Sequence, residues 1–350
     1  MKNTLKILVA AALCLAATSC ADKSPQDREM DRFISSLMKR MTFEEKVGQL
    51  NMPDHGTMTT GNGASFNIAE RIIKGEAGAI LNARGYKKIY ELQHLAVDSS
   101  RLGIPLLFGM DVIHGYQTVF PIPLGLSCTW DMEAVEESAH IAAVEASADG
   151  TNWTFSPMVD LGRDPRWGRV AEGNGEDPYL NARIAEAMVW GYQGRPGHRF
   201  EKEDQIMACV KHFALYGAAE AGRDYNTVDM SRQKMFNEYM VGYKAAADAG
   251  AGSFMTSFNV VDDVPASVNR WLMTDVLRKQ WGWNGFVVTD YIAINECVDH
   301  GVGNYHEVAV KALKAGVDMD MVGETFFTQA KSAVEAGELK MEDVDRACRR

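Results

Sequence analysis

The sequence lacks the features that would support binding to nucleic acid or to an anionic surface. Its 350 residues include 36 Lys and Arg against 47 Asp and Glu, which gives a formal net charge of −11 at pH 7, and no basic run or stripe occurs. Phosphate-binding proteins need clustered positive charge. We therefore expect no nucleic-acid partner.

The sequence also lacks paired cysteines and clustered metal ligands. Past the N-terminal segment, the cysteines are single and widely separated: Cys128, Cys209, Cys297 and Cys348. Zinc sites need several Cys or His ligands at short spacing, and His-Glu-x-x-His is absent. No Gly-x-Gly-x-x-Gly motif follows an early strand to bind a dinucleotide. We expect no metal and no cofactor, and we interpret these cysteines as small buried hydrophobic residues.

No apolar run is long enough to cross a membrane as a stable helix. The N-terminal run covers residues 8–17, after Lys2 and Lys6 and before two small residues and Cys20. About ten apolar residues are typical of an export signal. We predict that residues 1–19 are removed, which changes the net charge to −13. Cys20 resembles the lipid-attachment site of bacterial lipoproteins, and plain secretion with cleavage nearby is the alternative. Either route predicts a periplasmic or outer-membrane-anchored protein.

The rest of the chain alternates short apolar runs with longer helical patterns. Residues 20–29 have the composition of a tether, and one domain is expected over residues 30–350. Eight apolar runs predict strands, at residues 47–52, 77–81, 104–110, 152–159, 207–213, 253–258, 286–289 and 317–321. The segments between them have helical periodicity, for example residues 86–100, 131–149, 178–193, 231–248 and 271–280.

Eight such alternations predict a (β/α)8 barrel, with a doubly wound open sheet as the alternative. The last predicted helix, residues 341–350, stops without a cap, so we expect the sequence to be truncated at its C-terminal end.

Polar residues at the predicted strand ends form a candidate site, because barrel active sites lie at the carboxyl ends of the strands. Asp290 follows the apolar run 286–289 and precedes Tyr291. A carboxylate beside an aromatic ring suits a sugar-cleaving nucleophile, although an aspartate at that position could also cap the next helix. Asp111 ends another strand and could accept hydrogen bonds from vicinal hydroxyls, or anchor a loop.

Two further segments carry unusual charge. Residues 160–177 combine arginines, carboxylates and a tryptophan, which predicts at least in part a salt-bridge network that rigidifies the rim. Lys211 and His212 are adjacent near the end of an apolar run. Side chains alternate across a strand, so both can face one site only if the strand ends or bulges there. A buried Lys211 would need a carboxylate partner, either Asp290 or Asp111.

These motifs occur in the order found in the family-3 glycoside hydrolases, the β-glucosidase and β-xylosidase group, and the sequence resembles the N-terminal barrel of that family. The resemblance covers about residues 41–347. It rests on five segments, at residues 110–115, 163–169, 175–178, 211–213 and 288–291. Each motif is modest by itself, and their order makes the resemblance specific.

The resemblance implies that Asp290 is the nucleophile and that no cofactor is used. It implies that the glycone hydroxyls are held by a set of charged residues, namely Asp111, Arg169, Lys211, His212 and Arg223. Tyr291 stands where the family usually has tryptophan, and Met255 is placed at the substrate site. Phe258 stands where many members have a tyrosine, whose hydroxyl it cannot replace. We also expect the positive charge of Lys211 and the arginines to keep Asp290 ionised.

The proton donor is not evident in this sequence. In two-domain members it is a glutamate of a second domain, which would lie beyond Arg350. The single-barrel β-N-acetylglucosaminidases use a histidine in the loop after the Lys-His strand, and residues 213–228 contain none. We predict a retaining exo-acting β-glycosidase, foremost a β-glucosidase acting on short oligosaccharides. The alternatives are a β-xylosidase or β-N-acetylglucosaminidase, and a non-catalytic glycan-binding lipoprotein.

Overall fold

The computed structural model describes residues 24–56, 67–200 and 202–350. It divides into two units, Met1–Met41 and Thr42–Arg350. The described part of the first unit is a helix, α2 (Pro25–Arg40), which begins inside the predicted tether. The reason is a capping box, because Ser24 and Asp27 satisfy each other's backbone N–H groups and Pro25 occupies the first helical position. The barrel unit therefore begins at Thr42, later than the expected residue 30.

In its described residues, the second unit contains a closed ring of eight parallel strands. The strands are β1 (Asn51–Met52), β2 (Ala79–Leu81), β3 (Leu107–Met110), β4 (Trp153–Thr154), β5 (Met207–Phe213), β7 (Ser253–Thr256), β10 (Phe286–Val288) and β11 (Asp320–Met321). Six of them form one sheet in the order β10-β7-β5-β4-β3-β2, and β1 pairs with β11. Parallel bridges from Asp54 to Leu81 and from Val288 to Met319 join these two sheets at both edges. The (β/α)8 barrel is confirmed, and the open doubly wound sheet was wrong.

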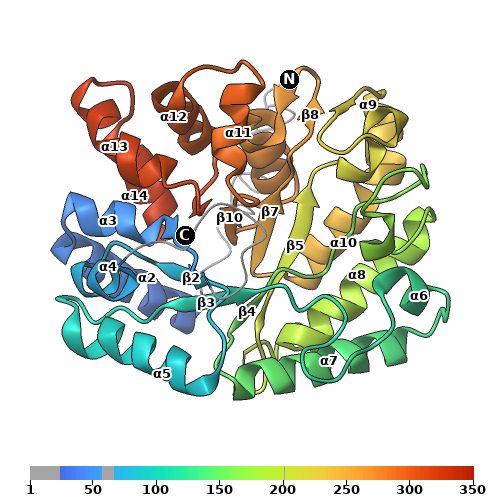
Figure 1. Ribbon diagram of the computed structural model, residues 1–350, viewed down its shortest axis with the longest axis horizontal. Coiled ribbons are helices and arrows are strands. Elements are labelled where there is room, and N and C mark those ends of the chain that lie inside the picture. The colour runs from blue at the N-terminus through green and yellow to red at the C-terminus, as the bar shows by residue number, and fades with distance from the viewer. Residues whose placement is uncertain (1–23, 57–66, 201) are drawn as a thin grey trace, which may run out of the picture. The chain divides into compact units, whose positions relative to one another are not determined.

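Helices surround the strands, as Figure 1 shows. They are α3 (Phe43–Gln49), α4 (Ile68–Lys74), α5 (Tyr86–His94) with η2 (Leu95–Ser99), α6 (Pro123–Ser127), α7 (Met132–Ala148), η3 (Val170–Glu172), α8 (Pro178–Gln193), η4 (Tyr216–Ala218), η5 (Glu220–Gly222), α9 (Arg232–Lys234), η6 (Met235–Tyr239), α10 (Val241–Ala249), η7 (Ala266–Val268), η8 (Trp271–Gln280), α11 (Ala293–Asp299), α12 (Tyr305–Ala315), α13 (Thr325–Glu335) and α14 (Met341–Arg349). A small separate sheet contains β6 (Thr227–Val228), β8 (Val260–Val261) and β9 (Val264–Pro265).

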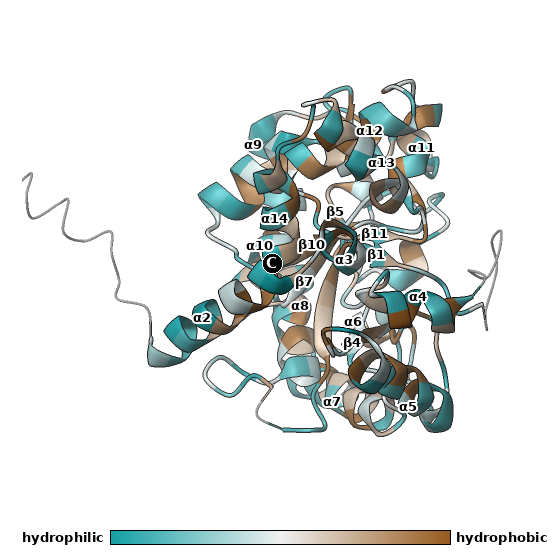
Figure 2. Cartoon of the chain, turned by 90° about the vertical axis from the view of Figure 1, so that its left-hand side faces the viewer, coloured by the Kyte–Doolittle hydropathy of each residue, from teal (hydrophilic) through white to brown (hydrophobic). Residues whose placement is uncertain are grey.

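The helices pack an apolar face against the strands and leave a polar face outside. Helices α4 and α5 carry both hydrophilic and hydrophobic residues in Figure 2. The barrel interior is filled by large side chains, including the fully buried Trp153 and Phe155. A glycine is required among them, because a Cβ on Gly109 would lie 2.6 Å from Phe155 Cζ and 2.7 Å from Met52 Cε.

The eight predicted strands each contain an observed strand, and β5 and α8 have the predicted bounds. The first prediction was wrong over residues 47–49, which belong to α3. A capping box between Thr42 and Glu45 starts that helix, and its effect outweighs the strand preference of one valine. The cysteine interpretation holds for Cys209 and Cys297, whereas Cys128 is exposed. In the described ranges, no helix has the length and apolarity needed to span a membrane.

Candidate active site

The carboxyl ends of all eight barrel strands contribute side chains to one cavity of about 350 Å³. Each lining residue lies at the end of a strand or in the loop after it, as the parallel topology requires. The lining residues are Asp54, Leu81, Asn82, Asp111, Phe155, Arg169, Lys211, Tyr225, Met255, Phe258, Asp290, Tyr291 and Met321. A cavity that mixes charged groups with aromatic rings suits a small polar ligand that also has an apolar face.

The polar side of the cavity is built from paired charges. Lys211 Nζ lies 2.6 Å from Asp111 Oδ1, and the Lys211 side chain is only 3% exposed. Asp111 is therefore the partner that a buried lysine needs, as one of the two predicted alternatives stated. Arg169 makes a bidentate pair with Glu172 at 2.8 and 2.9 Å. Both cations keep N–H groups directed at the cavity that they line, so they can donate to hydroxyl groups.

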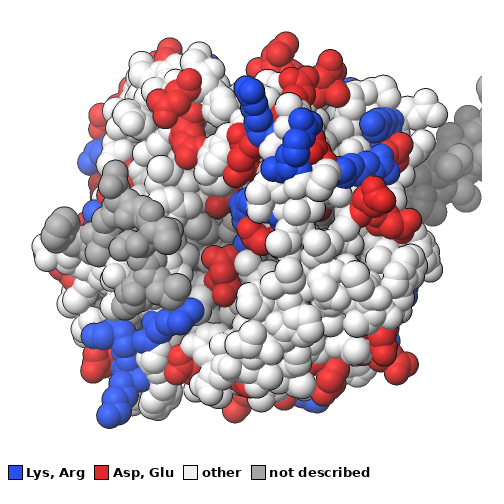
Figure 3. Space-filling model, turned by 45° about the vertical axis from the view of Figure 1, so that its right-hand side comes forward, with Lys and Arg blue, Asp and Glu red and all other residues white. Residues whose placement is uncertain are grey.

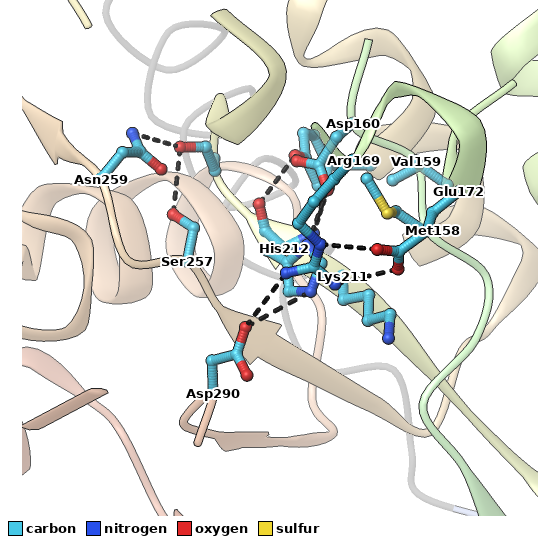
Figure 4. Close-up of polar contacts among 12 residues, drawn as sticks. Met158, Val159, Asp160, Arg169, Glu172, Lys211, His212, Ser257, Asn259 and Asp290 are labelled. Carbon is cyan, nitrogen blue, oxygen red and sulfur yellow. Dashed lines mark hydrogen bonds and ion pairs between the residues drawn. The ribbon is translucent and has the colours of Figure 1, made fainter. Parts of the chain in front are cut away.

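Asp290 lies at the centre of this arrangement, with His212 and Arg169 facing it (Figure 4). Its Oδ2 atom is 3.4 Å from His212 Nε2 and 3.9 Å from Arg169 Nη1, and Oδ1 accepts a 2.7 Å hydrogen bond from the N–H of Tyr291. Among the described residues, none hydrogen-bonds to the buried Oδ2 atom. The backbone thus fixes Oδ1, and Oδ2 is buried against His212 and Arg169.

His212 is fixed by a buried hydrogen-bond network with Asp160 and Tyr243. Asp160 Oδ2 accepts from the N–H of His212 at 2.9 Å and lies 2.8 Å from His212 Nδ1. Tyr243 donates its hydroxyl to Asp160 Oδ1 at 2.5 Å and lies 2.7 Å from the carbonyl oxygen of His212. Burial lowers the pKa of His212 well below its usual value and raises the pKa of Asp160 to about 7. The imidazole is therefore a neutral, fixed neighbour of Asp290.

The pKa of Asp290 is raised to about 6. Burial is the largest cause, and it outweighs the opposing effect of Arg169 and Lys211, which lower the pKa. The cations act in the expected direction and leave Asp290 able to ionise near neutral pH, but burial, which the sequence did not reveal, makes the net change in pKa upward. Glu172 differs, because its pair with Arg169 outweighs burial and lowers its pKa.

Six of the eight predicted site residues line the cavity, namely Asp290, Asp111, Arg169, Lys211, Tyr291 and Met255. His212 lies beneath it and contacts Asp290 instead. Lys211 and His212 reach the same site because the pairing register of β5 shifts between Val210 and Phe213, which is the expected bulge. Arg223 is exposed and does not line the cavity, which corrects its predicted place. Gly222, the residue before it, has a φ of +64°, so the backbone turns sharply at this point.

Several charged residues of the 160–177 loop have structural contacts, as predicted. Asp164 pairs with Arg166, and Asp177 caps α8 by accepting from the N–H of Leu180. Trp167 is buried and donates its indole N–H to Asp224 at 2.9 Å. On the face drawn in Figure 3, acidic and basic side chains lie next to one another in small groups. The described residues contain no group of three or more His, Cys, Asp or Glu that could hold a metal ion.

Sequence reasoning missed Asp54, Asn82 and Tyr225. Asp54 follows β1 by two residues, so the rule that located Asp111 and Asp290 at strand ends would also have located it. Asn82 follows β2 directly, and its positive φ of 58° aims it inward. Tyr225 lies in a long loop after β5, where no periodic pattern indicates direction.

A carboxylate that lines a cavity with cations beside it and aromatic rings around it can attack the anomeric carbon of a bound sugar. The sequence supports this chemistry independently, because residues 42–350 match the profile described as the glycosyl hydrolase family 3 N terminal domain. The chain belongs to glycosyl hydrolase family 3. Its fold and its five ordered motifs agree with that membership.

Relatives in this family are β-glucosidases and β-xylosidases. A periplasmic β-glucosidase of Salmonella typhimurium is 44% identical over 321 residues, covering 91% of this chain and 41% of the relative. A β-xylosidase of Formosa agariphila is 30% identical, covering 88% and 38%. A β-glucosidase structure from Listeria innocua in complex with isofagomine is 43% identical with a TM-score of 0.86, covering 91% and 45%. The chain spans less than half the length of these relatives.

Proposed function

We propose that this chain is the nucleophile-bearing barrel of a retaining exo-acting β-glycosidase, foremost a β-glucosidase that removes terminal sugars from short oligosaccharides. The observation that carries the proposal is Asp290, a carboxylate with a 13% exposed side chain that lines a cavity together with Asp111, Arg169 and Lys211. The family membership and the β-glucosidase relatives support it. A pure glycan-binding protein would not need a carboxylate so placed.

In this proposal the Asp290 carboxylate attacks the anomeric carbon and forms a covalent glycosyl-enzyme, while the bond to the leaving group breaks. Lys211, Asp111 and Arg169 hold the hydroxyls of the sugar being cleaved off, and His212 keeps Asp290 in position. Tyr291 and Met255 supply apolar contact area. Water then releases the sugar with its β configuration retained.

We propose that the proton donor is a carboxylic acid from outside these 350 residues. A retaining enzyme needs a second carboxyl about 5 to 5.5 Å from the nucleophile. Glu172 is occupied by Arg169, and its lowered pKa makes it a poor acid. Glu296 on α11 is the alternative within the chain, because burial and the nearby Asp290 raise its pKa to about 7. It does not line the cavity, so we place it second.

The full-length protein should be labelled covalently at Asp290 by a 2-deoxy-2-fluoro-β-glucoside with an activated leaving group. The fluorine slows both steps, and a good leaving group lets the glycosyl-enzyme accumulate. Peptide mass spectrometry identifies the labelled residue. Labelling of another carboxylate would overturn the assignment, and binding without labelling or turnover would favour a glycan-binding protein.

The rate constant kcat/KM should fall about tenfold per pH unit below pH 6. Asp290 must be ionised to attack, and its pKa in the free protein is about 6. Lys211→Met should move this acidic limb to higher pH, because Lys211 lowers the pKa of Asp290. The measurement is the pH profile of an aryl β-glucoside with wild type and variant. A limb that does not move would mean that another group controls it.

Xylose is the second candidate for the sugar that is removed, because a relative at 30% identity is a β-xylosidase. A panel of aryl β-glucoside, β-xyloside and β-N-acetylglucosaminide substrates separates these specificities. We also propose export to the periplasm, which the Salmonella relative supports. The export signal over residues 1–19 and the lipid anchor at Cys20 lie outside the described residues, and they stay proposals. Mass spectrometry of the mature N-terminus tests both.

A further inference from the structure

The cavity has two chemically unlike sides. The polar side comes mainly from the ends of β1 to β5, with Asp54, Asn82, Asp111, Arg169 and Lys211. The opposite side is formed by Met255, Phe258, Tyr291 and Met321 from the ends of β7, β10 and β11, with Tyr225 from the loop after β5. A sugar offers hydroxyls to the first side and C–H groups to the second. The proposed function uses the polar side together with Tyr291 and Met255, and Tyr225 has no role in it.

Tyr225 and Phe258 stack on each other on this apolar side. Their ring centroids are 4.5 Å apart with an interplanar angle of 32°. The small sheet outside the barrel explains the contact, because β6 pairs in parallel with β8 through Thr227 to Val260. Tyr225 and Phe258 each lie two residues before that pair. The same register therefore brings both rings to the cavity side by side.

The loop that carries Tyr225 is anchored at both ends. Before the ring, Asp224 accepts the indole N–H of the buried Trp167 at 2.9 Å. After it, Asn226 Nδ2 donates to the carbonyl of Glu220 at 3.1 Å, and Thr227 donates to the Glu220 carboxylate at 3.0 Å. Tyr225 itself has a φ of +65°, so the backbone turns sharply to present its side chain. A ring fixed in this way costs little entropy when it contacts a ligand.

The exposed fractions of Phe258 and Tyr225 indicate how deep each ring lies in the cavity. Phe258 is 8% exposed and Tyr225 is 39% exposed. The Asp290 side chain is 13% exposed, a fraction close to that of Phe258 and well below that of Tyr225. We therefore place Phe258 in the inner part of the cavity, near Asp290 and the glycosidic bond, and Tyr225 nearer the opening of the cavity. Tyr225 reaches the part of a substrate that lies beyond that bond.

We propose that Tyr225 is a specificity-determining residue for the leaving group and selects leaving groups that present an apolar face, such as an aryl group or the C–H face of a second sugar. This inference rests on the proposed function. Phe258 lies deeper on the same apolar side, and its ring packs against the ring of Tyr225. Burial raises the pKa of Tyr225 to about 12, so its hydroxyl stays protonated and able to donate to oxygen atoms of the leaving group.

Two β-glucosides test this role, one with a 2-phenylethyl and one with a methyl leaving group. Both leaving groups are simple alcohols of similar basicity, and only the first has an apolar face. For the full-length protein, Tyr225→Ala should reduce kcat/KM for the phenylethyl glucoside about tenfold, mainly through KM, and change the methyl glucoside less than about twofold. Tyr225→Phe should keep most of the preference. Tyr305→Ala is the matched control, because Tyr305 is exposed on α12 outside the cavity.

A second readout separates this role from a structural one. The rate of labelling by 2-deoxy-2-fluoro-β-glucosyl fluoride, whose leaving group is a single ion, should be unchanged in Tyr225→Ala. Equal losses for both glucosides and for labelling would mean that Tyr225 only supports the fold, which overturns the proposal. If the wild type neither labels nor turns over, the proposed function fails. In that case, calorimetry measures the affinities of wild type and Tyr225→Ala for the phenylethyl and methyl 1-thio-β-glucosides. If the variant prefers the phenylethyl compound as strongly as the wild type does, the inference about Tyr225 is overturned as well.

Discussion

Asp290→Asn is expected to reduce kcat/KM for an aryl β-glucoside by at least about 10³-fold, because the amide cannot attack the anomeric carbon. The substitution has nearly the same shape, and asparagine can still accept the N–H of Tyr291 that Asp290 now accepts. Initial rates with purified full-length protein measure the loss. A variant that retains more than about a tenth of wild-type activity would show that Asp290 is not the nucleophile.

The stability of Asp290→Asn shows whether its loss of activity comes from misfolding. The raised pKa of Asp290 means that burial penalises its charged form, so the wild type loses stability as pH rises through about 6. Asp290→Asn carries no such charge. It should match the wild type near pH 4 and be the more stable of the two at pH 8, by about 1 to 2 kcal/mol in urea unfolding. A marked loss of stability at pH 8 would point to misfolding as the cause of inactivity.

Chemical rescue adds a stereochemical test. Asp290→Gly leaves space on the face of the sugar that the carboxylate attacks, and azide can enter there. With an activated β-glucoside, this variant should form the α-glucosyl azide, which NMR spectroscopy distinguishes from the β-azide. Formation of the β-azide would place the nucleophile on the other face and assign Asp290 a different role.

Asp160→Ala is expected to lower the free energy of unfolding by about 3 to 5 kcal/mol at pH 6. The carboxylate is fully buried and accepts from the backbone N–H of His212 and from the hydroxyl of Tyr243, and it lies 2.8 Å from His212 Nδ1. Removing it leaves the backbone N–H and the Nδ1 of His212 without an acceptor, and each such buried donor costs about 1 to 3 kcal/mol. Tyr243 keeps the carbonyl oxygen of His212 as an acceptor. Urea unfolding followed by tryptophan fluorescence measures the loss.

The pH dependence of this cost has a definite sign. The folded-state pKa of Asp160 is raised to about 7, so its contribution to stability is complete below its unfolded pKa near 4 and declines as pH rises through 7. The cost of Asp160→Ala should therefore be smaller at pH 9 than at pH 5. Glu176→Ala is the control, because Glu176 belongs to the same loop and is not buried. Equal costs for the two variants would contradict the network described around His212.

The sequence predicted the barrel and most of the site because both depend on local patterns. Apolar runs mark buried parallel strands, and the residue after each run lies on the rim, which locates Asp111 and Asp290. Lys211 lies within its run and is recognised as a site residue because a charged side chain there needs a carboxylate partner. The pKa of Asp290 could not be predicted, because burial and two cations oppose each other and their balance depends on distances. Arg223 and Tyr225 are two residues apart in one loop, and only its turns decide which of them faces the cavity.

Ring closure has a consequence for how this protein is made. The first barrel strand, at Asn51 and Met52, pairs with the last, at Asp320 and Met321. During synthesis one edge of the first strand therefore has no partner until residues 320–321 have been translated. An unpaired parallel edge is prone to associate with other chains. We expect translation intermediates that end before Met321 to be prone to aggregation.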